Sequence, residues 1–74
     1  MSQQAITEPP LKERILRLED VKFRTGLSRT AIYRMMENRN FPRPISLGLR
    51  SVGWVESEID TWVQGQILQS RREV

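Results

Sequence analysis

Residues 25–38 read TGLSRTAIYRMMEN, and this stretch decides the fold. Gly26 can take the left-handed backbone conformation that ends a helix, and Ser28 is a preferred N-cap residue for the next one. We therefore predict a short helix over residues 19–25, a tight turn, and a second helix over residues 29–38. Leu27 and Ile32 have the separation of a hydrophobic staple, which fixes how the chain enters the second helix.

The second predicted helix has two chemically different faces. At about 100° per residue, the apolar face carries Ala31, Ile32, Met35 and Met36. The polar face carries Arg29, Thr30, Tyr33, Arg34 and Glu37. A face that only meets solvent more often holds Glu, Lys and Gln, so an aromatic ring beside two arginines indicates a binding partner.

The chain before the helix pair predicts a tail and a strand. Residues 1–13 lack periodicity and contain Pro9 and Pro10, which is typical of a flexible tail. Residues 14–18 alternate and predict a short strand or an extended lead-in, with Ile15, and as a second candidate Leu16, facing the core.

The chain after the helix pair predicts a hairpin. Two prolines in NRNFPRP, residues 38–44, are incompatible with a helix, and Phe41 is expected to fold back onto the core. A β-hairpin follows, with a four-residue tip at residues 48–51 that carries Arg50. Its strand-like runs are residues 45–47 and 52–54.

Residues 56–70 predict a closing helix that begins with a capping box of Ser57 and Asp60. Its apolar stripe is Ile59, Trp62, Val63 and Ile67, and both Trp62 and Trp54 are expected in the core. We expect one domain over residues 14–70 and fraying at residues 71–74. About three turns without a heptad seam predict no long dimer coil.

Composition excludes several classes of function. A chain of 74 residues without Cys or His cannot form a disulfide or a thiolate metal site, and it lacks the commonest catalytic base. Glu56, Glu58 and Asp60 are interpreted as capping and helix-dipole groups. We expect no enzyme activity, cofactor, metal ion or small-molecule substrate. Without a membrane-spanning run or a secretory signal, we expect a cytoplasmic, nucleoid-associated protein.

Charge is concentrated in the middle of the chain. The net charge is +3, but residues 21–50 alone carry seven cations against Glu37, a balance of +6. Six of the seven cations are Arg, whose planar guanidinium suits phosphates and guanine edges. This distribution is typical of nucleic-acid binding.

The order of elements predicts a mainly α fold with a small β-hairpin, a winged helix-turn-helix. In this motif the second helix, here about residues 28–38, lies in the DNA major groove, and the hairpin of residues 45–54 acts as a wing. The candidate DNA-binding residues are Lys22, Arg24, Ser28, Arg29, Thr30, Tyr33, Arg34, Arg43 and Arg50. Double-stranded DNA is the expected partner.

Residues 14–62 resemble the AlpA-type phage regulatory proteins, a branch of the MerR-like and excisionase-like winged helix-turn-helix group. The resemblance is carried by TGLSRTAIYR at 25–34, FPRPI at 41–45, LG at 47–48, RSVGW at 50–54, EID at 58–60, and Trp62. It implies a small DNA-binding regulator of a prophage or integrated element that controls an integrase or excision gene. It also implies that Arg29, Thr30, Tyr33 and Arg34 lie on the recognition helix and Arg50 on the wing.

Two other functions remain open alternatives. An excisionase would use the same fold to bend DNA, and it would bind at attachment sites rather than at a promoter. A protein-interaction module, such as an antirepressor, would show no salt-dependent DNA binding and would need a large exposed apolar patch, which the pattern does not predict. Weak or DNA-dependent self-association is also left open.

Overall fold

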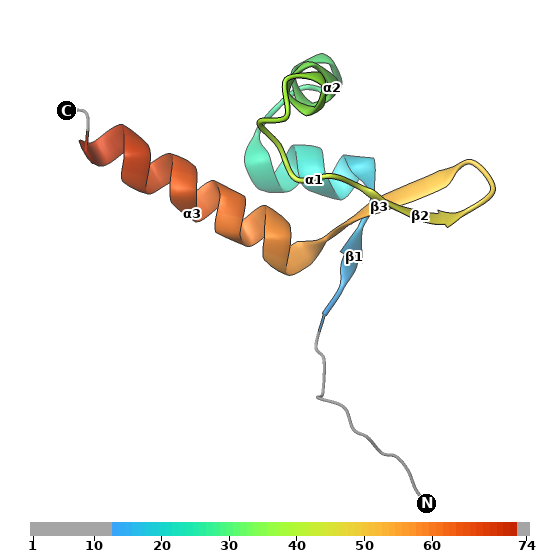
Figure 1. Cartoon of the computed structure of the whole chain (residues 1–74). Helices are drawn as coiled ribbons and strands as arrows, with labels where there is room; N and C mark the ends of the chain where they lie inside the picture. Colours follow the sequence, from blue (N-terminus) through green and yellow to red (C-terminus); the bar gives the residue numbers. More distant parts are fainter. Residues whose placement is uncertain (1–12, 73–74) are drawn as a thin grey trace, which may run out of the picture.

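The computed structural model describes residues 13–72; the predicted tail up to residue 12 and the last two residues of the predicted frayed end lie outside them. Figure 1 shows α1 and α2 above a small sheet, while the β2–β3 hairpin and the far half of α3 leave this body in opposite directions. The predicted mainly α winged helix-turn-helix with a small β-hairpin is confirmed. Its elements are β1 (Ile15–Leu16), α1 (Leu18–Thr25), α2 (Arg29–Glu37), β2 (Ile45–Gly48), β3 (Ser51–Val55) and α3 (Glu56–Arg72).

The turn between α1 and α2 forms as the sequence predicts. Gly26 has a φ of 77°, and its N–H donates to the carbonyl oxygen of Lys22 at 2.7 Å, which ends α1. The Thr25 hydroxyl accepts from the N–H of Leu27 at 3.2 Å. Ser28 then caps α2, because its hydroxyl accepts from the N–H of Ala31 at 3.1 Å. Local hydrogen bonds therefore fix the angle between the two helices.

The strands form one antiparallel sheet in the order β1-β3-β2. Gly48 pairs with Ser51, so the hairpin tip is the two residues Leu49 and Arg50 and not the four residues predicted. The register shifts between Ser46 and Gly48, which leaves Leu47 as the extra residue of β2. Such a bulge changes the pairing of a hairpin in a way that alternation of residue types does not reveal.

Six side chains form the buried core of the described residues, and no two of them come from the same element. They are Leu16, Val21, Ile32, Phe41, Trp54 and Ile59. Around them pack the partly buried Leu18, Leu27, Met35, Met36, Trp62 and Val63. The first candidate for the inward residue of β1 was wrong: Leu16 is 2% exposed, whereas Ile15 is 38% exposed. Phe41 folds back onto the core, as predicted.

Both tryptophans hold the proline-containing segment between α2 and β2. The indole N–H of Trp54 donates to the carbonyl oxygen of Pro42 at 3.1 Å, and that of Trp62 donates to Asn40 at 2.8 Å. The rings of Phe41 and Trp62 meet edge to face, with centroids 4.8 Å apart. A segment that cannot form a helix or a strand is thereby fixed against the body, and it sets the position of the hairpin relative to α2.

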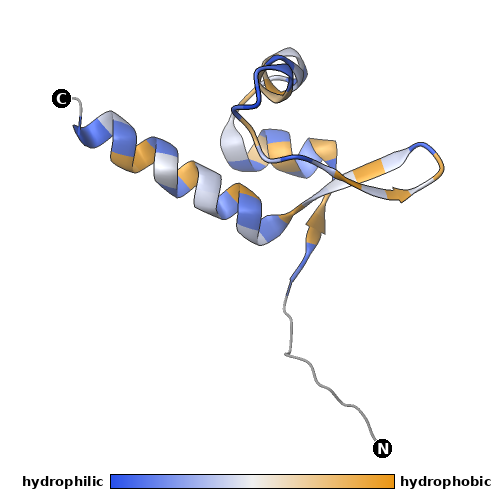
Figure 2. Ribbon diagram, viewed as in Figure 1, coloured by the Kyte–Doolittle hydropathy of each residue, from blue (hydrophilic) through white to orange (hydrophobic). Residues whose placement is uncertain are grey.

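The closing helix α3 begins at Glu56, as predicted, but it differs from the prediction in its cap and its end. The capping box of Ser57 and Asp60 does not form. Instead the carboxylate of Glu13, expected in the tail, accepts from the Ser57 N–H at 3.1 Å and from its hydroxyl at 3.0 Å. The helix extends to Arg72. Of the predicted stripe, Ile67 lies beyond the core and is 37% exposed. Figure 2 shows apolar and polar residues interleaved along this helix.

Gly53 is the position where the sheet tolerates no side chain. A Cβ atom there would overlap Cγ2 of Ile15, and it would lie 3.1 Å from both the Leu16 carbonyl oxygen and Cδ1 of Leu47. We expect Gly53→Ala to lower the free energy of unfolding by about 1–3 kcal/mol, the usual cost of overpacking, in urea denaturation.

Gly65→Ala in α3 is the matched control for Gly53→Ala. A Cβ at Gly65 meets nothing within 4 Å, so this variant should gain about 0.5–1 kcal/mol from helix propensity. Equal unfolding midpoints for the two variants would contradict the close approach of the strands at Gly53.

Candidate nucleic-acid interface

The outward face of α2 brings together five of the predicted site residues. Ile32 is fully buried on the inner face, so the opposite side of the helix meets solvent. Ser28, Arg29, Thr30 and Arg34 are exposed, and Tyr33 is half-buried. A shallow hollow on this face is lined by Arg29, Thr30, Tyr33, Arg34 and Glu37. The face therefore offers hydroxyl and guanidinium donors on a rigid helix.

Arg29 and Tyr33 also contact each other on this face. The guanidinium carbon of Arg29 lies 5.5 Å from the centre of the Tyr33 ring, which is within the range of a cation–π interaction. Because the two residues are one helical turn apart, the ring holds the guanidinium close to the helix surface. This contact limits the rotamers of a long side chain before any ligand binds.

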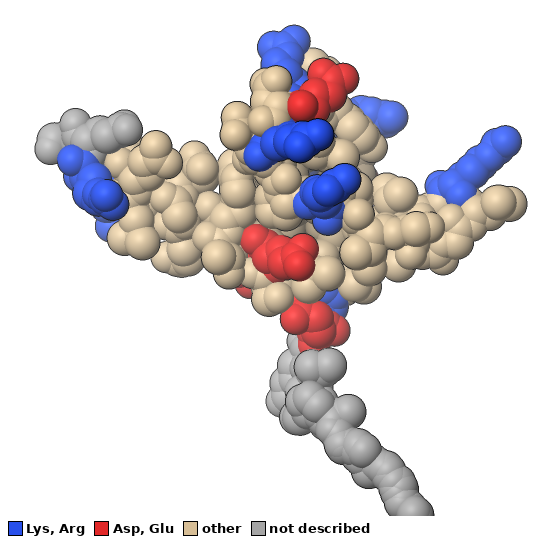
Figure 3. All heavy atoms as spheres, in the orientation of Figure 1, with Lys and Arg blue, Asp and Glu red and all other residues tan. Residues whose placement is uncertain are grey.

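Two further arginines flank the end of α2. Arg43 is exposed, as predicted, and it lines a hollow together with Arg39, Met36, Phe41 and Pro42. Arg39 was not among the predicted site residues, although it is exposed and has a φ of 60° directly after the helix. The signal that could have found it is its place after Asn38, where α2 has to end before the prolines. Figure 3 shows Lys and Arg side chains gathered over α1 and α2.

Arg50 lies at the tip of the hairpin arm, apart from α2. It is exposed and has a φ of 59°, a conformation that few residues other than glycine and asparagine adopt without strain. Beside it, Leu49 is 90% exposed. The hairpin exposes more apolar surface than its sequence pattern predicts, because Ile45, Leu47 and Val52 are each about 40% exposed.

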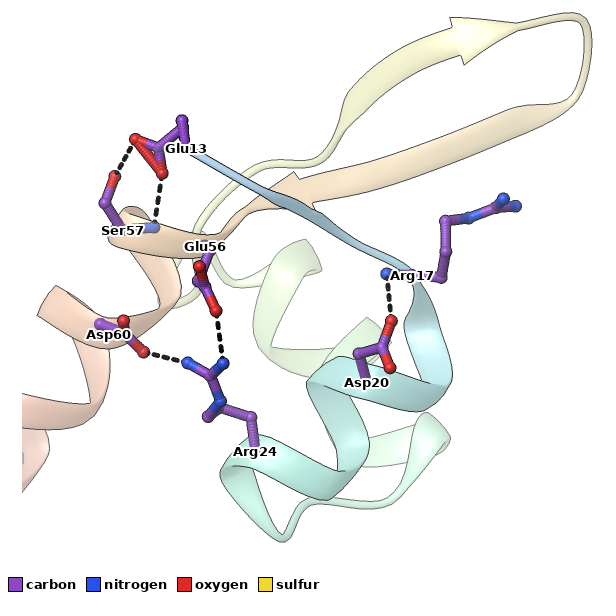
Figure 4. A network of polar contacts seen from close by, with 7 residues as sticks. All are labelled: Glu13, Arg17, Asp20, Arg24, Glu56, Ser57 and Asp60. Atoms are coloured by element: carbon purple, nitrogen blue, oxygen red, sulfur yellow. Dashed lines mark hydrogen bonds and ion pairs between the residues drawn. The ribbon is translucent and has the colours of Figure 1, made fainter. Parts of the chain in front are cut away.

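The remaining predicted cations are already paired within the protein. Arg24 forms ion pairs with Glu56, at 2.5 Å, and with Asp60, and so joins α1 to α3 (Figure 4). Hydrogen bonds to Glu56 and then to Asp60 raise the pKa of Arg24 above its usual value, so the guanidinium stays charged. Lys22 pairs with Glu19 at 3.3 Å. Any phosphate would compete with these carboxylates.

Among residues 13–72, no group of His, Cys, Asp or Glu side chains is arranged to hold a metal ion. No helix in this range is both long enough and apolar enough to cross a membrane.

Comparison with known proteins identifies the family. Residues 14–67 match the family model described as "Prophage CP4-57 regulatory protein (AlpA)". The chain belongs to the AlpA family of prophage regulatory proteins. The matched range begins one residue before β1 and ends within α3, so it contains the helix-turn-helix and the hairpin. AlpA-type regulation is therefore the family context of this chain.

Two relatives are similar over most of the chain. The "DNA-binding transcriptional activator AlpA" of Escherichia coli K12 is 43% identical over 56 residues, which are 68% of this chain and 80% of that protein. "Uncharacterized protein ORF88" of Enterobacteria phage P4 is 39% identical over 61 residues, which are 82% of this chain and 69% of that protein. No solved structure matches significantly.

The Ser28 cap can be tested without any ligand. Ser28→Ala removes the acceptor for the Ala31 N–H, and it should lower the free energy of unfolding by about 1 kcal/mol in urea denaturation. Ser28→Asn retains a capping oxygen and should unfold close to the wild-type midpoint. If the Asn variant lost as much stability as the Ala variant, the hydroxyl would not act as a cap.

Proposed function

We propose that this chain is a sequence-specific double-stranded DNA-binding regulator of a prophage or integrated element. In this proposal α2 enters the major groove, the β2–β3 hairpin acts as the wing, and the regulated gene encodes an integrase or an excision factor. The observation that carries the proposal is the outward face of α2, where two exposed arginines, Thr30 and Tyr33 surround a capped helix start. Membership of the AlpA family and the printed function of the E. coli relative support it.

The chemistry of this face fits base recognition. Arg29 and Arg34 can each donate two hydrogen bonds to O6 and N7 of a guanine. The exposed N–H groups at the start of α2 and the Ser28 hydroxyl favour a phosphate oxygen, which would fix the register of the helix on the duplex. Arg43, Lys22 and Arg24 are proposed phosphate contacts, and the last two would have to exchange a carboxylate for the phosphate.

Arginine substitutions should separate base contacts from phosphate contacts. We expect Arg34→Ala and Arg29→Ala each to reduce the free energy of binding by about 1–3 kcal/mol on a site selected from random-sequence duplexes. The reduction on unselected DNA should be much smaller. For the wild type, the logarithm of the association constant should fall linearly with the logarithm of the salt concentration. The slope should be about −4.5 if about five phosphates are contacted. Fluorescence anisotropy at several salt concentrations measures both. Salt-independent or absent binding would overturn the proposal.

The wing can be tested with a substitution that respects its backbone. Because Arg50 has a positive φ, Arg50→Asn removes the charge at a conformation that Asn tolerates better than Ala does. If Arg50 contacts a phosphate, this variant should weaken binding to all sequences and reduce the salt slope by about one unit. If it enters a narrow minor groove, the loss should be greater on A·T-rich flanks. Unchanged affinity on both flanks would limit recognition to α2.

An excisionase is the second candidate, and Leu49 favours it. Apolar side chains that DNA-bending proteins insert into the minor groove are exposed at the end of a projecting element, as Leu49 is at the hairpin tip. Mapping the protected sites across the host element distinguishes the two functions: a regulator protects a promoter, and an excisionase protects attachment sites. Leu49→Ser should reduce DNA bending only in the second case.

A further inference from the structure

The far half of α3 is longer than the packing of the domain requires. Residues 64–72 are all exposed, whereas Trp62, Val63 and the fully buried Ile59 hold the first half on the body. Figure 1 shows this half projecting away from the other elements. An unsupported helix of this length is marginal in water, so a surface that packs against it would stabilise it.

One face of α3 carries Glu58 and Arg72 at equal distances from Gly65, in opposite directions along the helix. Glu58, Thr61, Gly65, Leu68 and Arg72 follow each other at alternating intervals of three and four residues, so they share a face, and all are exposed. The absent side chain at Gly65 leaves a shallow groove, which is lined by Gly65, Leu68, Gln69 and Arg72. Ile59 and Val63, which pack against the core, point to a different side of the helix.

The charges on this face are complementary to themselves. Glu58 and Arg72 each lie seven residues from Gly65, about 10 Å along the helix axis in opposite directions. Neither forms an ion pair with another residue of the described range. An antiparallel second copy that crosses at Gly65 brings Arg72 beside Glu58 of the partner subunit, twice by symmetry. A parallel copy would oppose like charges instead.

We infer that this face of α3 is a self-association surface, on which a second copy of the chain packs antiparallel with the two-fold axis at Gly65. Without a Cβ at the crossing, the two helices approach closely. Leu68, which is 62% exposed, then packs beside Thr61 of the partner subunit. Exposed ion pairs are individually weak and the apolar area is small, so the association is weak and depends on concentration and salt.

Single-cysteine cross-linking tests the position of the axis, because the natural chain has no cysteine. In Leu68→Cys the two thiols lie about 9 Å apart along the helix axis on the side that faces the partner, and Gly65 is unchanged. In the control Ile67→Cys, about 160° around the helix from Gly65, the two thiols point away from each other. With a short bis-maleimide and purified full-length protein without DNA, we expect several-fold more covalent dimer for the first variant over a concentration series. Equal yields, or no dimer from either variant, would overturn the inference.

A charge exchange tests the orientation independently. Glu58→Arg alone and Arg72→Glu alone each place like charges together, and each should weaken self-association about tenfold in sedimentation equilibrium. The double variant carries the pair in reverse and should return to within about threefold of the wild-type dissociation constant. A double variant as weak as the single ones would exclude the antiparallel contact. Both experiments omit DNA, so their failure is separate from a failure of the proposed DNA binding.

Discussion

The buried core draws one side chain from each of six places along the chain: β1, α1, α2, the 38–44 segment, β3 and α3. Burial of one such side chain is worth about 1.5–3 kcal/mol, and a small domain has only a few kcal/mol of net stability. No element can therefore lose its contribution without consequence for the whole. With so little core, the orientation of the elements has to come from polar contacts at its edge.

Those polar contacts divide the charges of the protein into two groups. The carboxylates of Glu13, Asp20, Glu56 and Asp60 are used inside the fold: they bind a helix start, a backbone N–H or the Arg24 guanidinium (Figure 4). In contrast, the arginines of α2, Arg43 and Arg50 form no ion pair within the described residues. The outward face of α2 therefore keeps arginines without an ion pair inside residues 13–72, although Glu37 lies on the same face.

The sequence predicted best those features that depend on neighbouring residues. The turn from Gly26 to Ser28 and the two faces of α2 need only backbone geometry and helical periodicity, and both are confirmed. The predicted capping box of α3 was wrong because Ser57 binds Glu13, 44 residues earlier, and Asp60 binds Arg24, 36 residues earlier. The inward residue of β1 depends on the space that Gly53 leaves for Ile15. Long-range partners of this kind leave no periodic signal in the sequence.

The tyrosine and the two tryptophans are intrinsic fluorophores that report on two different parts of the domain. The chain has one tyrosine, Tyr33, on the face of α2, and two tryptophans, both hydrogen-bonded to the segment that joins α2 to the hairpin. Tyrosine emission thus reports the chemical surroundings of the helix face, and indole emission reports the joint between helix and hairpin. Without any label, the two signals can show whether an event at the helix is transmitted to the joint or stays local.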